Sequence, residues 1–292
     1  MYCSVLTTDQ VRRIHEASLL VLDRIGVGIP HPEVLSRLDD AGARVDRTAQ
    51  RAWIQPDLVE SSLRQCGKQY TLFGRDLSRR AIFGQGGRNY NSIAGEASWL
   101  ESDGGGRRFG RLSDVMDAAR LGEALPGLSV VGAMADPHEI PTNYRCVEVL
   151  ATLVRHTTKP VTFWFHDRAS AEYINEILVV LRGDEARARA YPLCYPFLEP
   201  ISPLRFPFQG LDLLFATARL NLPVPIGPMA QMGLSAPATL AGTMVQENAE
   251  ILAGICITQL IRPGMPVCYG GICHAFDMAT TQMIFGGPEQ AI

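Results

Sequence analysis

The sequence lacks any apolar run long enough to cross a membrane, because Arg, Asp, Gly or Pro interrupts every candidate before about 20 residues. A basic surface is also absent, since 27 Lys and Arg residues stand against 30 Asp and Glu residues, a formal net charge of −3. Nucleic acids and acidic membranes bind basic faces, so we expect neither as a partner. Residues 1–17 lack the basic-then-apolar pattern of a signal peptide, and we therefore expect a cytoplasmic protein.

The ligand spacings of zinc sites are absent as well. The seven cysteines are scattered, and neither Cys-x-x-Cys nor His-Glu-x-x-His occurs. Cys268 and Cys273 lie on the two sides of a predicted strand end, a spacing that does not match a zinc motif. We expect reduced cysteines without a disulfide framework, and no metal bound by the chain.

The composition is that of an ordinary globular protein. The chain has 292 residues, of which 47% are hydrophobic and 20% are charged. This length is sufficient for one large domain or two small ones. The first part, residues 1–110, is predicted to be a lead-in: short helices follow one another to about residue 68, and glycine-broken β-type runs then extend to residue 100.

From residue 111 the pattern becomes a repeat in which one helix separates each apolar strand from the next. The predicted strands are 129–135, 160–165, 192–197, 223–229 and 266–272. Uninterrupted apolar strands joined by helices predict a parallel sheet with its strands in sequence order. Units of about 30 residues without a Gly-x-Gly-x-x-Gly turn favour a (β/α)₈ TIM barrel over a Rossmann sheet.

Five units do not close an eight-stranded barrel. Residues 286–292 have the pattern of a first helical turn, with Pro288 near its start. We therefore expect residues 111–292 to form a partial TIM-barrel catalytic domain in a truncated chain, with up to three units missing. The longest predicted helix of the repeat follows Pro237 and ends at Arg262, and its apolar spacing predicts one buried face, formed by Ala249, Leu252, Ala253, Cys256, Leu260 and Ile261.

Active sites of such barrels lie at the carboxyl ends of the strands. The acids and histidines at these ends are the predicted catalytic residues: Asp136, Glu199, His166 and His274. His166 and Asp167 are either a base with its orienting acid or part of a plain loop.

Aromatic side chains crowd the same strand ends and predict a site for an organic cation, which an aromatic face attracts. The predicted substrate-binding residues are Trp164, Phe165, Tyr195, Phe197, Gln231, Tyr269 and Arg205. Side chains alternate along a strand, so only some of these aromatics face the centre of a barrel, and Arg205 is alternatively a solvated surface residue.

Several stretches resemble the trimethylamine:corrinoid methyltransferase family, which includes glycine betaine methyltransferase-like members without pyrrolysine. The stretches are 6–46 (LTTDQVRRIHEASLLVLDRIGVGIPHPEVLSRLDDAGARVD), 111–141 (RLSDVMDAARLGEALPGLSVVGAMADPHEIP), 199–204 (EPISPL), 235–271 (SAPATLAGTMVQENAEILAGICITQLIRPGMPVCYGG) and 286–289 (GGPE).

The resemblance implies a TIM-barrel enzyme that moves a methyl group from a methylated amine to the cobalt of a separate corrinoid protein. The chain itself would bind no cofactor, because the corrinoid (cobalamin) belongs to the partner, and we expect a homo-oligomer. Trimethylamine members carry pyrrolysine in a part of the barrel beyond Ile292, and we favour the pyrrolysine-free branch. Arg205 is the candidate for a carboxylate such as that of glycine betaine. Two alternatives stay open: another metal-independent TIM-barrel enzyme such as a lyase, and a non-catalytic small-molecule-binding barrel.

Overall fold

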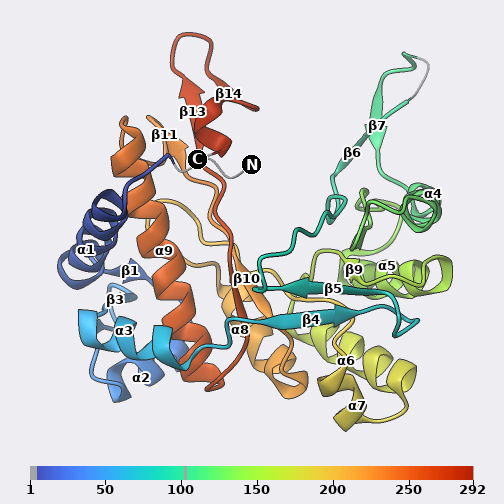
Figure 1. Ribbon diagram of the computed structural model, residues 1–292, viewed down its shortest axis with the longest axis horizontal. Helices are drawn as coiled ribbons and strands as arrows, with labels where there is room; N and C mark the ends of the chain where they lie inside the picture. The colour runs from blue at the N-terminus through green and yellow to red at the C-terminus, as the bar shows by residue number, and fades with distance from the viewer. Residues whose placement is uncertain (1–4, 102–103, 292) are drawn as a thin grey trace. The chain divides into compact units, whose positions relative to one another are not determined.

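The computed structural model describes residues 5–101 and 104–291, which fall into two compact units (Figure 1). Unit 1 comprises Met1–Cys66, Phe197–Leu211 and Val224–Ile292, so far as these are described. Unit 2 comprises Gly67–Pro196 and Asp212–Pro223. Each unit therefore combines a part of the predicted lead-in with a part of the predicted repeat, and each is described by itself below.

Unit 1 is built around one long helix. Its helices are α1 (Thr8–Arg24), α2 (Pro32–Asp40), α3 (Pro56–Gln65), α9 (Leu240–Ile261) and the 3₁₀ turn η2 (Pro288–Ala291). Its strands are β1 (Val27–Gly28), β2 (Arg44–Asp46), β3 (Arg51–Trp53), β10 (Val224–Ile226), β11 (Gln231–Met232), β12 (Val267–Tyr269), β13 (His274–Asp277) and β14 (Gln282–Ile284).

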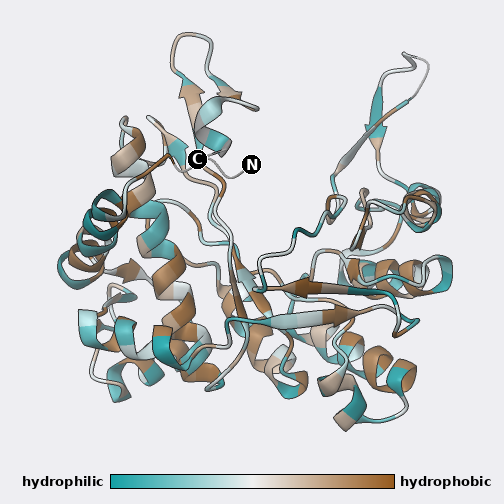
Figure 2. Cartoon of the chain, viewed as in Figure 1, coloured by the Kyte–Doolittle hydropathy of each residue, from teal (hydrophilic) through white to brown (hydrophobic). Residues whose placement is uncertain are grey.

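The helix at the centre of unit 1 is α9, against which α1, α2 and α3 all pack (Figure 1). Thr7 begins α1 with a capping box to Gln10. Figure 2 shows hydrophilic and hydrophobic residues side by side along α1, as expected of a helix with one face on a core. The prediction of a single buried face on α9 is wrong, because Ile251 and Ile257 on its other faces are also fully buried. The helices of the predicted lead-in, α1, α2 and α3, cover these other faces of α9.

Parallel strands lie on the other side of α9. β10 pairs in parallel with β12, with Val224 opposite Val267, each the second residue of its predicted strand. Leu198 forms a parallel bridge with Ile226 of β10, so the segment around Leu198 lies next to β10 on the side away from β12. β13 pairs in parallel with β11 and antiparallel with β14. The β13–β14 hairpin was not predicted.

Unit 2 contains the first βα repeats. Its helices are α4 (Leu112–Ala124), α5 (Thr142–His156), α6 (Arg168–Arg182), α7 (Glu185–Ala190), the 3₁₀ turn η1 (Ala218–Leu220) and most of α8 (Phe208–Thr217), in which the boundary between the units falls. Its strands are β4 (Tyr70–Phe73), β5 (Arg80–Phe83), β6 (Ser98–Leu100), β7 (Arg107–Phe109), β8 (Val131–Gly132) and β9 (Val161–Thr162).

The parallel pair β8–β9 lies against the largest apolar core of unit 2. Val131, the third residue of its predicted strand, stands opposite Val161, the second residue of the next predicted strand. The Val161 amide donates to the carbonyl oxygen of Leu193 at 3.1 Å, so segment 192–197 follows in the predicted order although it forms no regular strand. Val161, Phe163 and Leu193 are buried in this core together with apolar residues of α4, α5 and α6.

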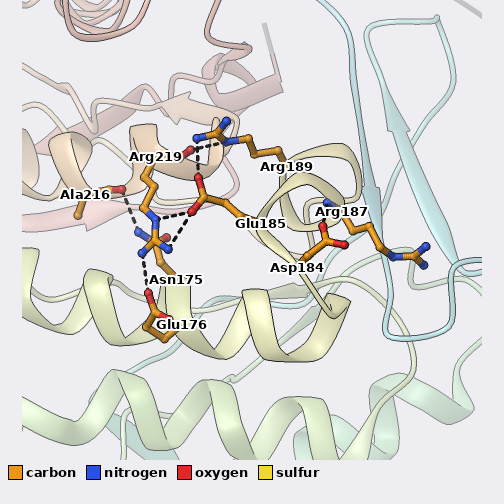
Figure 3. Close-up of polar contacts among 8 residues, drawn as sticks. All are labelled: Asn175, Glu176, Asp184, Glu185, Arg187, Arg189, Ala216 and Arg219. Carbon is orange, nitrogen blue, oxygen red and sulfur yellow. Dashed lines mark hydrogen bonds and ion pairs between the residues drawn. The ribbon is translucent and has the colours of Figure 1, made fainter.

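A polar network fastens α7 to its neighbours in unit 2 (Figure 3). Arg219 in η1 forms ion pairs with Glu176 of α6 and Glu185 of α7, at 2.5 and 2.9 Å. Arg189 pairs with Glu185 at 2.6 Å and donates to the carbonyl oxygen of Arg219. Each of the four side chains Arg219, Glu176, Glu185 and Arg189 has a charged partner, which indicates a structural role.

The parallel strands in the described residues are two to four residues long, shorter than the predicted runs. They belong to separate small sheets in the described part of the chain. The parallel direction of consecutive repeats is therefore observed within each unit, whereas the closed eight-stranded barrel and the division at residue 110 stay predictions.

Candidate functional site

Asp136 lies in unit 2, four residues beyond β8, and its charge is neutralised by a neighbour. Arg145 of α5 donates from Nη1 to Asp136 Oδ2 at 2.6 Å. The side chains are 23% and 12% exposed, so this ion pair is largely shielded from water. The Nε2 atoms of His138 and His166 lie 3.9 and 3.8 Å from the two carboxylate oxygens. Asp136 is thus surrounded by three groups that are or can become positive.

His166 faces Asp136 and not Asp167. Its Nδ1 lies 3.1 Å from the carbonyl oxygen of Thr142, and a carbonyl can only accept, so Nδ1 carries the proton in this contact. Asp167 instead caps α6, where its Oδ1 accepts from the Ser170 amide at 2.7 Å. The interpretation of Asp167 as the orienting acid of His166 is therefore wrong.

The two neighbouring aromatics that precede His166 have different surroundings. Trp164 donates from Nε1 to the carbonyl oxygen of Gly95 at 2.7 Å. Phe165 stacks on Phe163 with ring centroids 4.9 Å apart and packs against the core of unit 2. A cavity of about 10 Å³ beside Trp164, Asp136 and His166 has room for about one water molecule.

The predicted residues of the third and fourth strands are also dispersed. Tyr195 packs in unit 2 against a small cluster with Leu72 of the β4–β5 hairpin. In unit 1, the Phe197 ring lies against Gly227. Glu199 and Arg205 are exposed, and the backbone of Arg205 bridges to Gly28.

Glu247 of α9 is a buried carboxylate in unit 1 that lies against the residues after β12. It is 8% exposed, and its Oε1 has no hydrogen-bond partner among the described residues. A Cβ on Gly271 would lie 2.7 Å from Glu247 Cδ and 2.8 Å from Oε1, so a side chain at this position would require the carboxylate to shift. Burial, with a smaller contribution from the charge of Glu250, raises the pKa of Glu247 to about 7.

Glu250, one turn along α9, is buried but fully hydrogen-bonded. Its Oε2 accepts from the Ser202 hydroxyl at 2.7 Å, and its Oε1 accepts from the Leu204 amide at 2.8 Å and from Gln246 at 3.1 Å. Burial raises the pKa of Glu250 as well. These bonds anchor the 202–204 segment to α9, so Glu250 has a structural role that Glu247 lacks.

Tyr269 of β12 reaches the same part of α9. Its hydroxyl donates to Asn248 Oδ1 at 3.0 Å, and Asn248 Nδ2 donates to the Ser18 hydroxyl of α1 at 2.9 Å. Partial burial, and then the charge of Glu247, raises the pKa of Tyr269 to about 12, so the phenol stays a donor. The residue is nevertheless 58% exposed, so part of it is accessible to solvent.

The remaining two candidates lie on the β11–β13 pair of unit 1, directly opposite each other. His274 is fully buried, with its ring centroid 4.5 Å from that of Phe285. Gln231 directs its amide nitrogen to the sulfur of Met283 at 3.4 Å. These contacts place both side chains within the β11–β13–β14 sheet.

Among residues 5–101 and 104–291, no three His, Cys, Asp or Glu side chains are grouped so that they could hold a metal ion. The helices in the same described part of the chain include none that is long and apolar enough to span a bilayer.

The charged or titratable residues of these clusters that were not predicted from the sequence include Glu247, His138 and Arg145. A signal for Glu247 was present, because the Gln-Glu-Asn triplet at 246–248 interrupts a long apolar helix, and buried charges in such a setting are rare. His138 follows Asp136 by two residues, so the prediction of His166 and His274 as the only strand-end histidines is wrong. Arg145 gave no signal, since nothing in the sequence distinguishes it from other helical arginines.

The family model of trimethylamine methyltransferase (MTTB) matches residues 1–292. A glycine betaine methyltransferase of Desulfitobacterium hafniense is 30% identical over 291 residues, which cover 99% of this chain and 60% of that protein. Trimethylamine methyltransferase MttB1 of Methanosarcina acetivorans is 29% identical over 291 residues, covering 98% and 59%. The chain spans about 60% of the length of these curated relatives.

Proposed function

Because the chain belongs to the trimethylamine methyltransferase family, we propose that it takes a methyl group from a methylated amine and passes it to the cobalt of a corrinoid protein. The match over residues 1–292 carries this proposal. The names of the similar proteins support a quaternary or tertiary methylamine as the donor. The corrinoid acceptor, which is the second substrate, follows from the family resemblance of the sequence.

The chemistry makes simple demands on the protein. The carbon–nitrogen bond breaks, the nitrogen keeps the electron pair, and the methyl carbon bonds to a nucleophilic cobalt(I). A cationic amine therefore becomes a neutral one, so the protein has to bind a positive nitrogen and orient one methyl group towards the acceptor. Strong attraction to the cation alone would stabilise the substrate more than the transition state, and would not speed the transfer.

A methylated nitrogen offers few or no hydrogens for bonding, so an aromatic face and a nearby carboxylate are the groups suited to it. Tyr269 and Glu247 provide this pair in unit 1. We propose that the amine binds there, beside Gly271.

Methyl transfer to free cob(I)alamin under anaerobic conditions tests the proposal. The full chain is mixed with trimethylamine, glycine betaine or tetramethylammonium, and the loss of the cobalt(I) absorbance is followed together with the demethylated amine by NMR. We expect transfer with at least one of the three donors and none with ethanolamine, which lacks an N-methyl group. Binding of the amines without transfer, also when a corrinoid protein is supplied, would contradict the proposal.

A further inference from the structure

We propose that Glu247 is the counter-ion of the substrate nitrogen: it is protonated in the empty site and releases its proton when a methylated ammonium ion binds beside Gly271 and Tyr269. This inference rests on the proposed function, because it names the group that recognises the cation. Three features of unit 1 support it.

The first feature is access. Gly271 and Ile272 are exposed, and Glu247 lies directly behind them on α9. Gly271 has no side chain, and the position that its Cβ would take lies 2.8 Å from Glu247 Oε1. A small cation that reaches Gly271 therefore comes close to Oε1, the atom that has no partner among the described residues.

The second feature is that none of the groups acting on Glu247 compensates its negative charge. The groups that act on the charge of Glu247 are Glu250 on the same helix and the Ile272 amide of the facing segment, and Tyr269 faces it from β12. Glu250 raises the pKa of Glu247, whereas the Ile272 amide lowers it; that amide also donates to the Pro228 carbonyl oxygen at 3.0 Å. None of these groups is a cation. A bound ammonium ion would supply the missing positive charge.

The third feature is the aromatic partner. The phenol of Tyr269 is held through Asn248 to Ser18, whose hydroxyl donates to the carbonyl oxygen of Ile14 or Val245, both at 2.8 Å. This chain of hydrogen bonds fixes the ring while its exposed part remains open. A fixed aromatic face next to a carboxylate matches the chemistry of a quaternary or tertiary ammonium ion.

The proton balance closes over one turnover. Binding of the cation displaces the carboxyl proton to the solvent, and the carboxylate then pairs with the ammonium ion. When the methyl group leaves, the nitrogen keeps the electron pair and becomes a neutral amine, which is a stronger base than the Glu247 carboxylate. The amine takes a proton from the solvent and leaves as an ammonium ion, and Glu247, again an uncompensated buried charge, then recovers the proton that it released on binding.

Calorimetric titration of the full chain with tetramethylammonium chloride tests this inference without requiring methyl transfer. Titrations in two buffers of different ionisation enthalpy give the number of protons released. With a pKa of about 7 in the empty protein, we expect about 0.5 proton released per cation at pH 7 and close to one at pH 6. As the pH rises towards 7, the dissociation constant should fall by up to about tenfold per pH unit, and above pH 7 it should become constant.

Glu247→Gln keeps the shape of the side chain but cannot ionise. This variant should release no proton, bind the cation about tenfold more weakly at pH 8, and show a dissociation constant that does not change with pH. Asp40→Asn is the matched control, because it removes one exposed negative charge from the same unit and should retain proton release.

The outcomes separate the two proposals. Binding without proton release in the unmodified chain would overturn the role of Glu247 and leave the methyltransferase proposal standing. No binding of tetramethylammonium or trimethylamine would overturn both. The measurement on the unmodified chain is decisive even if Glu247→Gln fails to fold.

Discussion

Asp136 in unit 2 and Glu247 in unit 1 are both carboxylates near the carboxyl ends of parallel strands, and their surroundings are opposite. Asp136 has an arginine at 2.6 Å and two histidines within 4 Å. Glu247 is more deeply buried, has another acid as its neighbour, and leaves one oxygen without a partner among the described residues.

This difference separates a carboxylate that is already paired from one that is available. A cation that binds Asp136 has to compete with Arg145, which is attached to the same unit. A cation that binds Glu247 stabilises the ionised form of this acid, which without a partner would be an unpaired buried charge that costs free energy. Strongly perturbed groups of this kind gather at functional sites, which favours Glu247 over Asp136 as the cation-binding acid.

The largest expected effect on stability is the pH dependence that Glu247 imposes. Its pKa is 4.5 in the unfolded chain and about 7 in the folded one, so between these values the folded state binds more protons. Stability therefore falls as the pH rises through this window, by roughly 3 kcal/mol in total. Glu247→Gln removes this loss and should be more stable than the unmodified chain at pH 8, by up to the same amount.

Urea denaturation at pH 5 and pH 8 measures this effect. Other groups also titrate in this range, so the quantity to compare is the change between the two pH values in each protein. Asp40→Asn, in the exposed part of α2, should retain the full change. Equal changes in Glu247→Gln and the unmodified chain would show that Glu247 is not an uncompensated acid.

A smaller effect is expected from opening the Asp136 pair. Arg145→Met keeps an unbranched apolar stem but removes the hydrogen bond to Asp136 and the bond from Nε to the Ile140 carbonyl oxygen at 3.0 Å. We expect a loss of about 1–2 kcal/mol in the free energy of unfolding, because the pair is largely shielded from water.

The control for this variant is on the same helix. Arg155 pairs with Glu148 at 3.6 Å, and its side chain is 67% exposed. Arg155→Met should cost less than about 0.5 kcal/mol, as is usual for solvated ion pairs. If both variants lose the same amount in urea denaturation, Asp136 is no better compensated than a surface acid and the contrast with Glu247 weakens.

The sequence was informative about periodicity and direction. Apolar runs predicted that the strands are parallel, and Val224 and Val267 were matched in the correct register. The capping residues of α1 and the turn after it were predictable because they depend on residues adjacent in the chain. What periodicity could not predict is which distant helix covers which face, and so the burial of the other faces of α9 by α1, α2 and α3 was missed.

The site was less predictable, for a related reason. Strand ends indicated Asp136 and Tyr269, but the partners that decide their roles come from helices: Arg145 from α5 and Glu247 from α9. The distance between a helical side chain and a strand end depends on how the two elements pack. The charge balance of each site therefore became visible only in three dimensions.

The smallest effect concerns Trp164, whose ring was expected to bind the cation. Its Nε1 donates to Gly95 at 2.7 Å, so the indole fastens the loop that precedes β6 to the strand end after β9. Trp164→Phe keeps an aromatic ring and loses this bond, which should lower the free energy of unfolding by about 1 kcal/mol.

Trp99→Phe is the control, because Trp99 packs against the apolar core of unit 2 and its indole forms no hydrogen bond to another described residue. If unit 2 has a structural role at this point and unit 1 recognises the cation, Trp164→Phe should change the unfolding midpoint and leave the tetramethylammonium dissociation constant within about twofold of the original. A dissociation constant that rises tenfold, with stability unchanged, would instead place the cation at Trp164 and reverse the contrast between the two units.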